Sequence, residues 1–195
     1  MAPASVASLR KFVRPRETEE RCDLCSVSLP PGHIHQFDPS TRRIRCACAD
    51  CAALPSGNWR EIPRRIVTLR DFRLSDMQWD DLMIPISLAF FSYSTPANRV
   101  VALYPGPAGA AESALRLEAW REIADANPEL LRLQPDVEAL LVNRVGAARE
   151  YFVTPIDECY RLVGLIRMHW RGLSGGAAVW GEIGLFFDGL RRKGA

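Results

Sequence analysis

Residues 22–51 read CDLCSVSLPPGHIHQFDPSTRRIRCACADC and hold five of the six cysteines and two of the three histidines of the chain. Within this stretch are two C-x-x-C pairs, Cys22 with Cys25 and Cys48 with Cys51, separated by 22 residues. The spacing is typical of four thiolates that converge on one tetrahedral zinc ion. The sequence therefore predicts a zinc-ribbon-like module over residues 21–56, in which a metal takes the place of a hydrophobic core.

Three further residues of the same stretch offer alternative ligands. Cys46 lies two residues before Cys48, and His33 and His35 lie midway between the two pairs. In an extended segment, His33 and His35 project to the same side. We expect zinc bound by the four cysteines of the two pairs, with Cys46, His33 and His35 as candidates for additional or substitute ligands in a mixed site.

A rubredoxin-like iron redox protein is a second alternative, because it also uses two C-x-x-C pairs. There the residue after the second cysteine of a pair is commonly glycine, whereas here it is Ser26 or Ala52. This difference favours zinc over iron. A zinc ion with four thiolates has no open coordination position and does no redox chemistry, so its expected role is structural. The site by itself therefore favours a binding module over an enzyme.

The whole chain suits an ordinary globular domain with a small appendage. It has 195 residues, of which 48% are hydrophobic and 25% charged. Residues 1–20 lack the apolar core of a secretory signal and are expected to form a flexible basic arm. The longest apolar run, residues 82–91, is too short to cross a membrane. The cytosol keeps thiols reduced, so C-x-x-C pairs in a sequence without an export signal indicate metal-bound thiolates and not disulfides. We therefore expect a cytoplasmic protein.

Positive charge is concentrated in the first part of the chain. Residues 1–73 carry 13 basic and 8 acidic side chains, against 12 and 15 in the remainder. The arginines that flank and follow the predicted module could form one basic face, either a solvated edge or a footprint for nucleic acid. They are Arg42, Arg43, Arg45, Arg60, Arg64 and Arg65. A zinc-ribbon nucleic-acid-binding protein is therefore the main alternative function.

Residues 63–195 are predicted to form an α+β domain, an antiparallel sheet with helices packed on one face. Alternating apolar residues and turn signals predict two strand pairs. Helix start signals and apolar stripes predict four helices. The expected strand pairs are residues 84–92 with 99–104 and residues 137–145 with 150–153. Two of the expected helices span residues 75–82 and 111–126; the third begins at Thr154-Pro155, and the fourth follows the turn at residues 172–176.

Familiar catalytic patterns are not found in the sequence. Cys159 and His169 lie ten residues apart on one predicted helix, roughly 15 Å along its axis, so they cannot form a nucleophile and base pair. No G-x-S-x-G elbow precedes a helix, and the loop at residues 105–111 lacks the lysine and hydroxyl pair of a P-loop. We therefore assign no catalytic residue.

Four segments beyond the cysteine-rich stretch carry a resemblance to a known family. They are YPGPAGAAESAL at 104–115, PDVEALLVNR at 135–144, PIDECYRLVGLIR at 155–167 and WRGLSGG at 170–176. Together with the cysteines, they resemble an uncharacterised bacterial family whose genes accompany high-affinity uptake nickel-iron hydrogenases. The resemblance covers nearly the whole chain. It implies a cytoplasmic accessory role, with a hydrogenase component or maturation factor as partner, and it implies no reaction.

Overall fold

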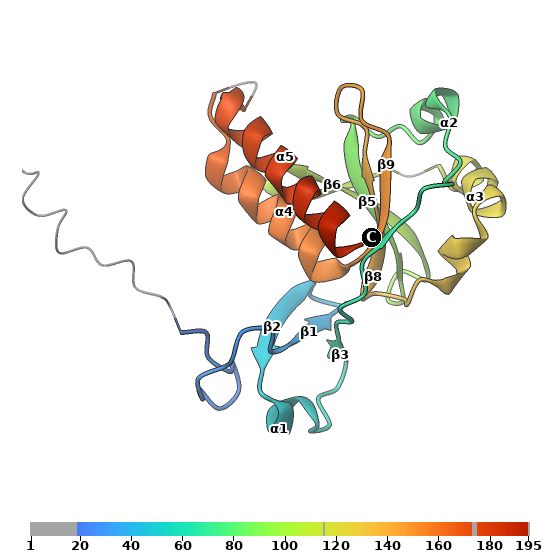
Figure 1. Cartoon of the computed structure of the whole chain (residues 1–195). Coiled ribbons are helices and arrows are strands. Elements are labelled where there is room, and N and C mark those ends of the chain that lie inside the picture. Colours follow the sequence, from blue (N-terminus) through green and yellow to red (C-terminus); the bar gives the residue numbers. More distant parts are fainter. Residues whose placement is uncertain (1–18, 115, 173–174, 195) are drawn as a thin grey trace, which may run out of the picture.

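The computed structural model describes residues 19–114, 116–172 and 175–194, which form two antiparallel sheets and five α-helices (Figure 1). The predicted arm, residues 1–20, lies outside the described residues except for Glu19 and Glu20. None of the described helices is long and apolar enough to cross a membrane. The mixed α+β class expected from the sequence is confirmed.

A small sheet of three strands in the order β2-β1-β3 forms the N-terminal part of the molecule. Strand β1 pairs with β2 as an antiparallel hairpin, in which His35 lies opposite Cys46 and Phe37 opposite Ile44. The two C-x-x-C turns and the short helix α1 lie at the far end of this hairpin (Figure 1). The elements are β1 Ile34–Asp38, β2 Arg43–Ala47, α1 Ala49–Ala52 and β3 Arg60–Glu61.

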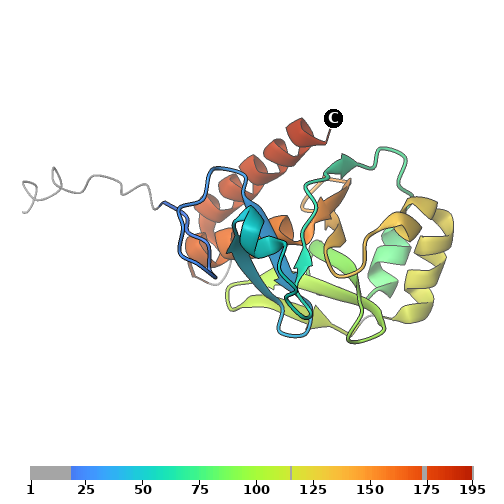
Figure 2. The same ribbon diagram turned by 90° about the horizontal axis from the view of Figure 1, so that it is seen from below.

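The larger sheet has six antiparallel strands in the order β4-β9-β8-β5-β6-β7. Both strand pairs expected from the sequence are present, as β5 with β6 and β8 with β9. Pairing between β5 and β8 joins the two pairs into one sheet. The strands are β4 Val67–Thr68, β5 Leu88–Ser94, β6 Arg99–Gly106, β7 Gly109–Ser113, β8 Glu138–Asn143 and β9 Glu150–Pro155. Seen from below, the small sheet lies in front of this larger sheet (Figure 2).

Helices cover both faces of the larger sheet, so the expectation of helices on one face is wrong. On one face lie α4 Ile156–His169 and α5 Gly176–Lys193; on the other lie α2 Asp76–Asp81, α3 Leu117–Ala126 and the 3-10 helix η2 Pro128–Arg132 (Figure 1). The reason lies in the central strands, because β8 is buried along all six residues. Such continuous burial requires cover on both sides.

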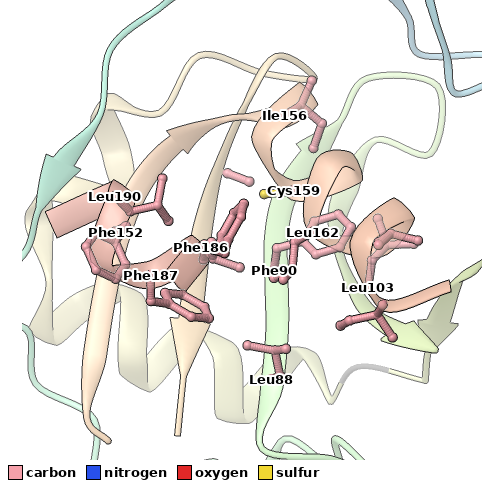
Figure 3. Packing of buried hydrophobic residues seen from close by; sticks show 14 of the residues in the cluster. Leu88, Phe90, Leu103, Phe152, Ile156, Cys159, Leu162, Phe186, Phe187 and Leu190 are labelled. Atoms are coloured by element: carbon pink, nitrogen blue, oxygen red, sulfur yellow. The ribbon is translucent and has the colours of Figure 1, made fainter. Parts of the chain in front are cut away.

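Adjacent residues of β5 show how the two cores are divided. Phe90 points toward α4 and α5 and packs with Phe152, Phe187 and their neighbours (Figure 3). Phe91 points to the opposite face and stacks on Trp120 of α3, with ring centroids 4.9 Å apart. Successive side chains of a strand alternate between faces, so one apolar strand serves two cores.

The segment at residues 109–113 is an edge strand and not the start of a helix, which corrects the helix expected over 111–126. The turn before it reverses the chain, with Gly109 at a φ of +129° that favours glycine. Glu112 then pairs with Arg42 and Arg99 across 2.6 and 2.7 Å. Helix α3 begins only at Leu117. Glu112, which lies within the range expected for the helix, is therefore part of an edge strand and is held by ion pairs with Arg42 and Arg99.

The small sheet is joined to the larger one by shared apolar contacts and by buried carboxylates. Phe37, Ile44 and Ile62 pack into the core formed with α4, where the ring centroid of Phe37 lies 6.0 Å from that of Tyr160. The buried carboxylate of Asp136 lies 3.3 Å from a guanidinium nitrogen of Arg60 in β3. In the segment directly after β3, Arg65 donates two hydrogen bonds, of 2.9 and 2.8 Å, to the fully buried carboxylate of Glu138. The boundary between the module and the α+β domain stays a prediction.

We predict that Leu130→Ala lowers the free energy of unfolding by about 2–4 kcal/mol, because it leaves a cavity in the core under α3. Leu130 is 8% exposed, whereas its neighbour Leu131 is 82% exposed. The matched control Leu131→Ala should therefore change the unfolding free energy by less than about 0.5 kcal/mol. Urea unfolding of both variants measures the difference, and equal losses would argue against a second core on this face.

Candidate metal centre

The two C-x-x-C turns face each other and bring their four sulfurs together. The Sγ atoms of Cys22, Cys25, Cys48 and Cys51 all lie within 4.8 Å of one another, and that of Cys25 is 3.7 Å from that of Cys48. In a tetrahedron with Zn–S bonds of about 2.3 Å, the sulfurs are roughly 3.8 Å apart. The described cysteines are all free thiols. The cluster therefore has the size and the donor set of a four-thiolate metal site.

Backbone hydrogen bonds shape the first turn around Cys22. The N–H of Cys22 donates to the carbonyl of Val27 at 2.9 Å, and the N–H of Ser26 donates to the carbonyl of Cys22 at 2.8 Å. Ser26 has a φ of +64°, the left-handed conformation that glycine adopts most easily. Serine thus makes the turn for which the sequence lacks the usual glycine. The missing glycine is therefore no obstacle to a metal-binding turn.

The second turn begins a short helix, and its first residue is Cys48. The Sγ of Cys48 accepts a hydrogen bond of 3.4 Å from the N–H of Cys51. The N–H of Cys48 also points at the sulfur of Cys22, and this contact does most to lower the pKa of Cys22 to about 6. Hydrogen bonds with the sulfurs of Cys48 and Cys25 raise the pKa of Cys51 to about 12. The cluster thus favours a first thiolate and resists the last one unless a cation neutralises it.

Very little apolar surface is buried around the two turns. Cys22 is 2% exposed, but the large apolar side chains nearby are open to solvent: Leu24 at 49%, Val27 at 50% and Leu54 at 61%. A segment with so small a core needs a cross-link to hold one conformation. A metal ion bound by the four sulfurs would provide that cross-link.

An open groove of about 630 Å³ lies between the two turns. Its lining includes Cys25 and Cys48 together with the apolar side chains of Val27, Leu29 and Ile34. The candidate metal centre therefore forms one wall of a concave and mainly apolar surface.

The other three candidate ligands form a group of their own. His33, His35 and Cys46 each offer a ligand atom within 4.8 Å of the other two, and none of them belongs to the four-cysteine cluster. This separation favours the four-cysteine set over a mixed set. Next to this group lies a residue that the sequence analysis missed: Asp157 of α4 accepts a hydrogen bond of 2.6 Å from Nδ1 of His35 and raises the pKa of that imidazole.

Most of the arginines expected to form a basic face have partners inside the chain. Arg42 forms an ion pair with Glu112, Arg60 with Asp136 and Arg65 with Glu138. Arg64 donates hydrogen bonds to the carbonyls of Gly32 and His33. The guanidinium of Arg45 lies over the ring of Trp59, 4.1 Å from its centroid. An arginine held this way is less available to a phosphate. The arrangement weighs against the nucleic-acid footprint considered from the sequence.

Cys159, the sixth cysteine, is fully buried in the core between α4 and the larger sheet (Figure 3). It belongs to neither of the two groups of candidate ligands. Burial raises its pKa well above the ordinary value for a thiol. Cys159 therefore serves as an apolar core residue.

Comparison with known proteins supports one assignment. No curated protein and no solved structure matches the chain. The family model described as a family of unknown function, DUF5947, matches residues 21–194 and so includes the cysteine turns as well as both sheets. The chain belongs to this family of unknown function, DUF5947.

Proposed function

We propose that this protein is a zinc-binding accessory protein of the cytoplasm that binds a component or maturation factor of a nickel-iron hydrogenase and catalyses no reaction of its own. The observation that carries the proposal is the convergence of four cysteine sulfurs from two separate turns. A metal with four thiolates is coordinatively closed, so its contribution is to fix the shape of the surrounding surface. The choice of a hydrogenase partner is supported by the sequence resemblance described above.

The surface around the turns suits a protein partner. Leu24, Val27 and Leu54 expose about half of their side chains or more and lie on the two cysteine turns or directly after them. Val27 also lines the groove between the turns. Exposed apolar side chains on the segments that form an apolar groove are a feature of protein-binding surfaces. Together with the internally paired arginines, they favour protein over nucleic acid.

We predict that protein purified without added metal contains zinc and that the double variant Cys25→Ser/Cys51→Ser loses one zinc ion per chain. The helical far-ultraviolet signal should persist, because α2 to α5 lie outside the cysteine turns. Cys159→Ala is the matched control, since it removes a thiol that is not in the cluster, and its zinc content should be unchanged. Elemental analysis and circular dichroism measure these outcomes.

Two results of the metal analysis would count against the proposal. A double variant that retains all of the zinc would show that the cluster is not the binding site. Bound iron with visible absorption, and no zinc, would favour the iron redox alternative.

We predict that Leu24→Ser/Leu54→Ser weakens binding to the purified hydrogenase component or maturation factor at least tenfold. Both changes remove apolar contact area beside the turns and leave the thiolates in place. Leu131→Ser, at an exposed leucine of η2, is the control and should bind like the unchanged protein. Titration calorimetry or surface plasmon resonance gives the affinities.

The nucleic-acid alternative is tested on the same samples. A generic DNA duplex should show no binding whose affinity falls steeply with salt, the behaviour expected when lysines and arginines displace counterions from phosphates. Duplex binding with a steep salt dependence, combined with no binding to any hydrogenase component, would favour nucleic-acid binding over the accessory role.

A further inference from the structure

The β1–β2 hairpin places three metal-binding side chains on one face. His33 and His35 are two residues apart along the same chain segment, and Cys46 of β2 lies directly opposite His35 in the strand register. Side chains two apart in a strand, or directly opposite across a pair, share a face. The rings of His33 and His35 accordingly meet edge to face, with centroids 4.8 Å apart. The backbone pairing thus holds two imidazoles and one thiol together.

Both imidazoles are oriented through their Nδ1 atoms. Nδ1 of His35 donates a hydrogen bond of 2.6 Å to Oδ2 of Asp157, and Nδ1 of His33 donates one of 3.2 Å to the carbonyl of Pro30. The carboxylate of Glu20 also lies 3.5 Å from Nδ1 of His33. A histidine that donates from one ring nitrogen to an oxygen presents the lone pair of the other nitrogen to a metal. In both rings, Nε2 is the atom left for that role.

The Nε2 atom of His33 is buried and has no hydrogen-bond partner among the described residues. The His33 side chain is only 4% exposed, so most of this polar ring is withdrawn from solvent. Burying a polar atom without a partner is costly. Within the described part of the chain, His35 and Cys46 each place a potential ligand atom within 4.8 Å of one on His33. A shared metal ion accounts for all three.

We infer that His33, His35 and Cys46 form a second metal site, separate from the four-cysteine cluster, that binds a divalent late first-row transition ion. Zinc and its first-row neighbours favour imidazole and thiolate donors, whereas magnesium and calcium favour oxygen donors. Asp157 and the carbonyl of Pro30 hold the imidazoles in place from behind. The ligand atoms lie within 4.8 Å of one another, so side-chain shifts of about 1 Å bring them to bonding positions around one ion.

The second site differs from the first in being open. It has three protein donors, and a four-coordinate ion would keep one place for water or another ligand. A cavity of about 380 Å³ leads to the two histidines, lined also by Asp157, Arg64 and Lys193. It lies between the small sheet and the ends of α4 and α5. The ion bound here would therefore be able to exchange or to take up a further ligand, in contrast to the closed four-thiolate centre.

Cobalt titration of protein that holds one zinc ion per chain, in the four-cysteine cluster, tests this site. Zinc in the four-cysteine cluster has no d–d absorption, so a visible cobalt band together with a near-ultraviolet thiolate-to-cobalt band reports a thiolate outside that cluster. We expect both bands to saturate at one added equivalent while the zinc content stays constant. His33→Ala and Cys46→Ser should each weaken cobalt binding at least 100-fold, and Cys46→Ser should abolish the thiolate band.

Control variants separate a missing ligand from a damaged fold. His169→Ala removes the third histidine of the chain, which is outside the group, and should leave both bands unchanged. His33→Gln keeps a polar side chain and should still lose cobalt binding, with its helical signal intact. Asp157→Asn alters a positioning residue, so cobalt affinity should fall about 10-fold to 100-fold while the thiolate band persists at saturation.

The result that would overturn the inference is the absence of a saturable cobalt signal while zinc stays bound, or a signal that survives both His33→Ala and Cys46→Ser. These outcomes are distinct from failure of the proposed function. A protein that binds cobalt through Cys46 but holds no zinc through Cys25 and Cys51 would contradict only the four-cysteine centre.

Discussion

The structure of the N-terminal region depends on the convergence of four cysteine sulfurs from two turns that are 22 residues apart in sequence. The turns themselves bury almost no apolar side chain besides Cys22, and their leucines and valine lie in solvent. Such a segment cannot offset its loss of conformational entropy through hydrophobic burial. Coordination of one ion by the four sulfurs would fix both turns at once and shape the groove between them.

The hairpin of β1 and β2 links this region to the rest of the molecule through three successive environments. At one end, Phe37 and Ile44 are opposite each other and pack into the core beside Tyr160. One pair further along the same face, His35 lies opposite Cys46 and faces Asp157 of α4. Beyond these residues lie the four cysteines. The two-residue period of the strands thus places the Phe37–Ile44 contact and the His35–Cys46 pair one after the other on one face, and the four cysteines lie outside the strands. The ion pairs of Arg42 with Glu112 and of Arg60 with Asp136 also connect the small sheet to the larger one.

Local signals in the sequence predicted the parts of the fold that local physics decides. The two strand pairs follow from alternating apolar residues around turns. Helix α2 lies within the helix expected over residues 75–82 and begins directly after Ser75, where the structure adds a capping box between Ser75 and Gln78. The cover on both faces of the sheet was not foreseen, although the unbroken apolar stretch of β5 is a signal for it. The helix expected over residues 111–126 overlaps the strand at Gly109–Ser113. Glu112 of this strand pairs with Arg42 and Arg99, and no local pattern in the sequence reveals these contacts.

The four cysteines of the first cluster could be selected from spacing alone, whereas the second group required the strand register. Counting outward from the turn after Asp38 would have placed Cys46 opposite His35, but the contribution of Asp157 comes from a residue 122 positions away. The proposal rests most directly on the four-thiolate centre, and zinc K-edge X-ray absorption of protein holding one zinc ion per chain tests it. The account predicts four sulfur scatterers at about 2.3 Å. A first shell dominated by nitrogen or oxygen would contradict it.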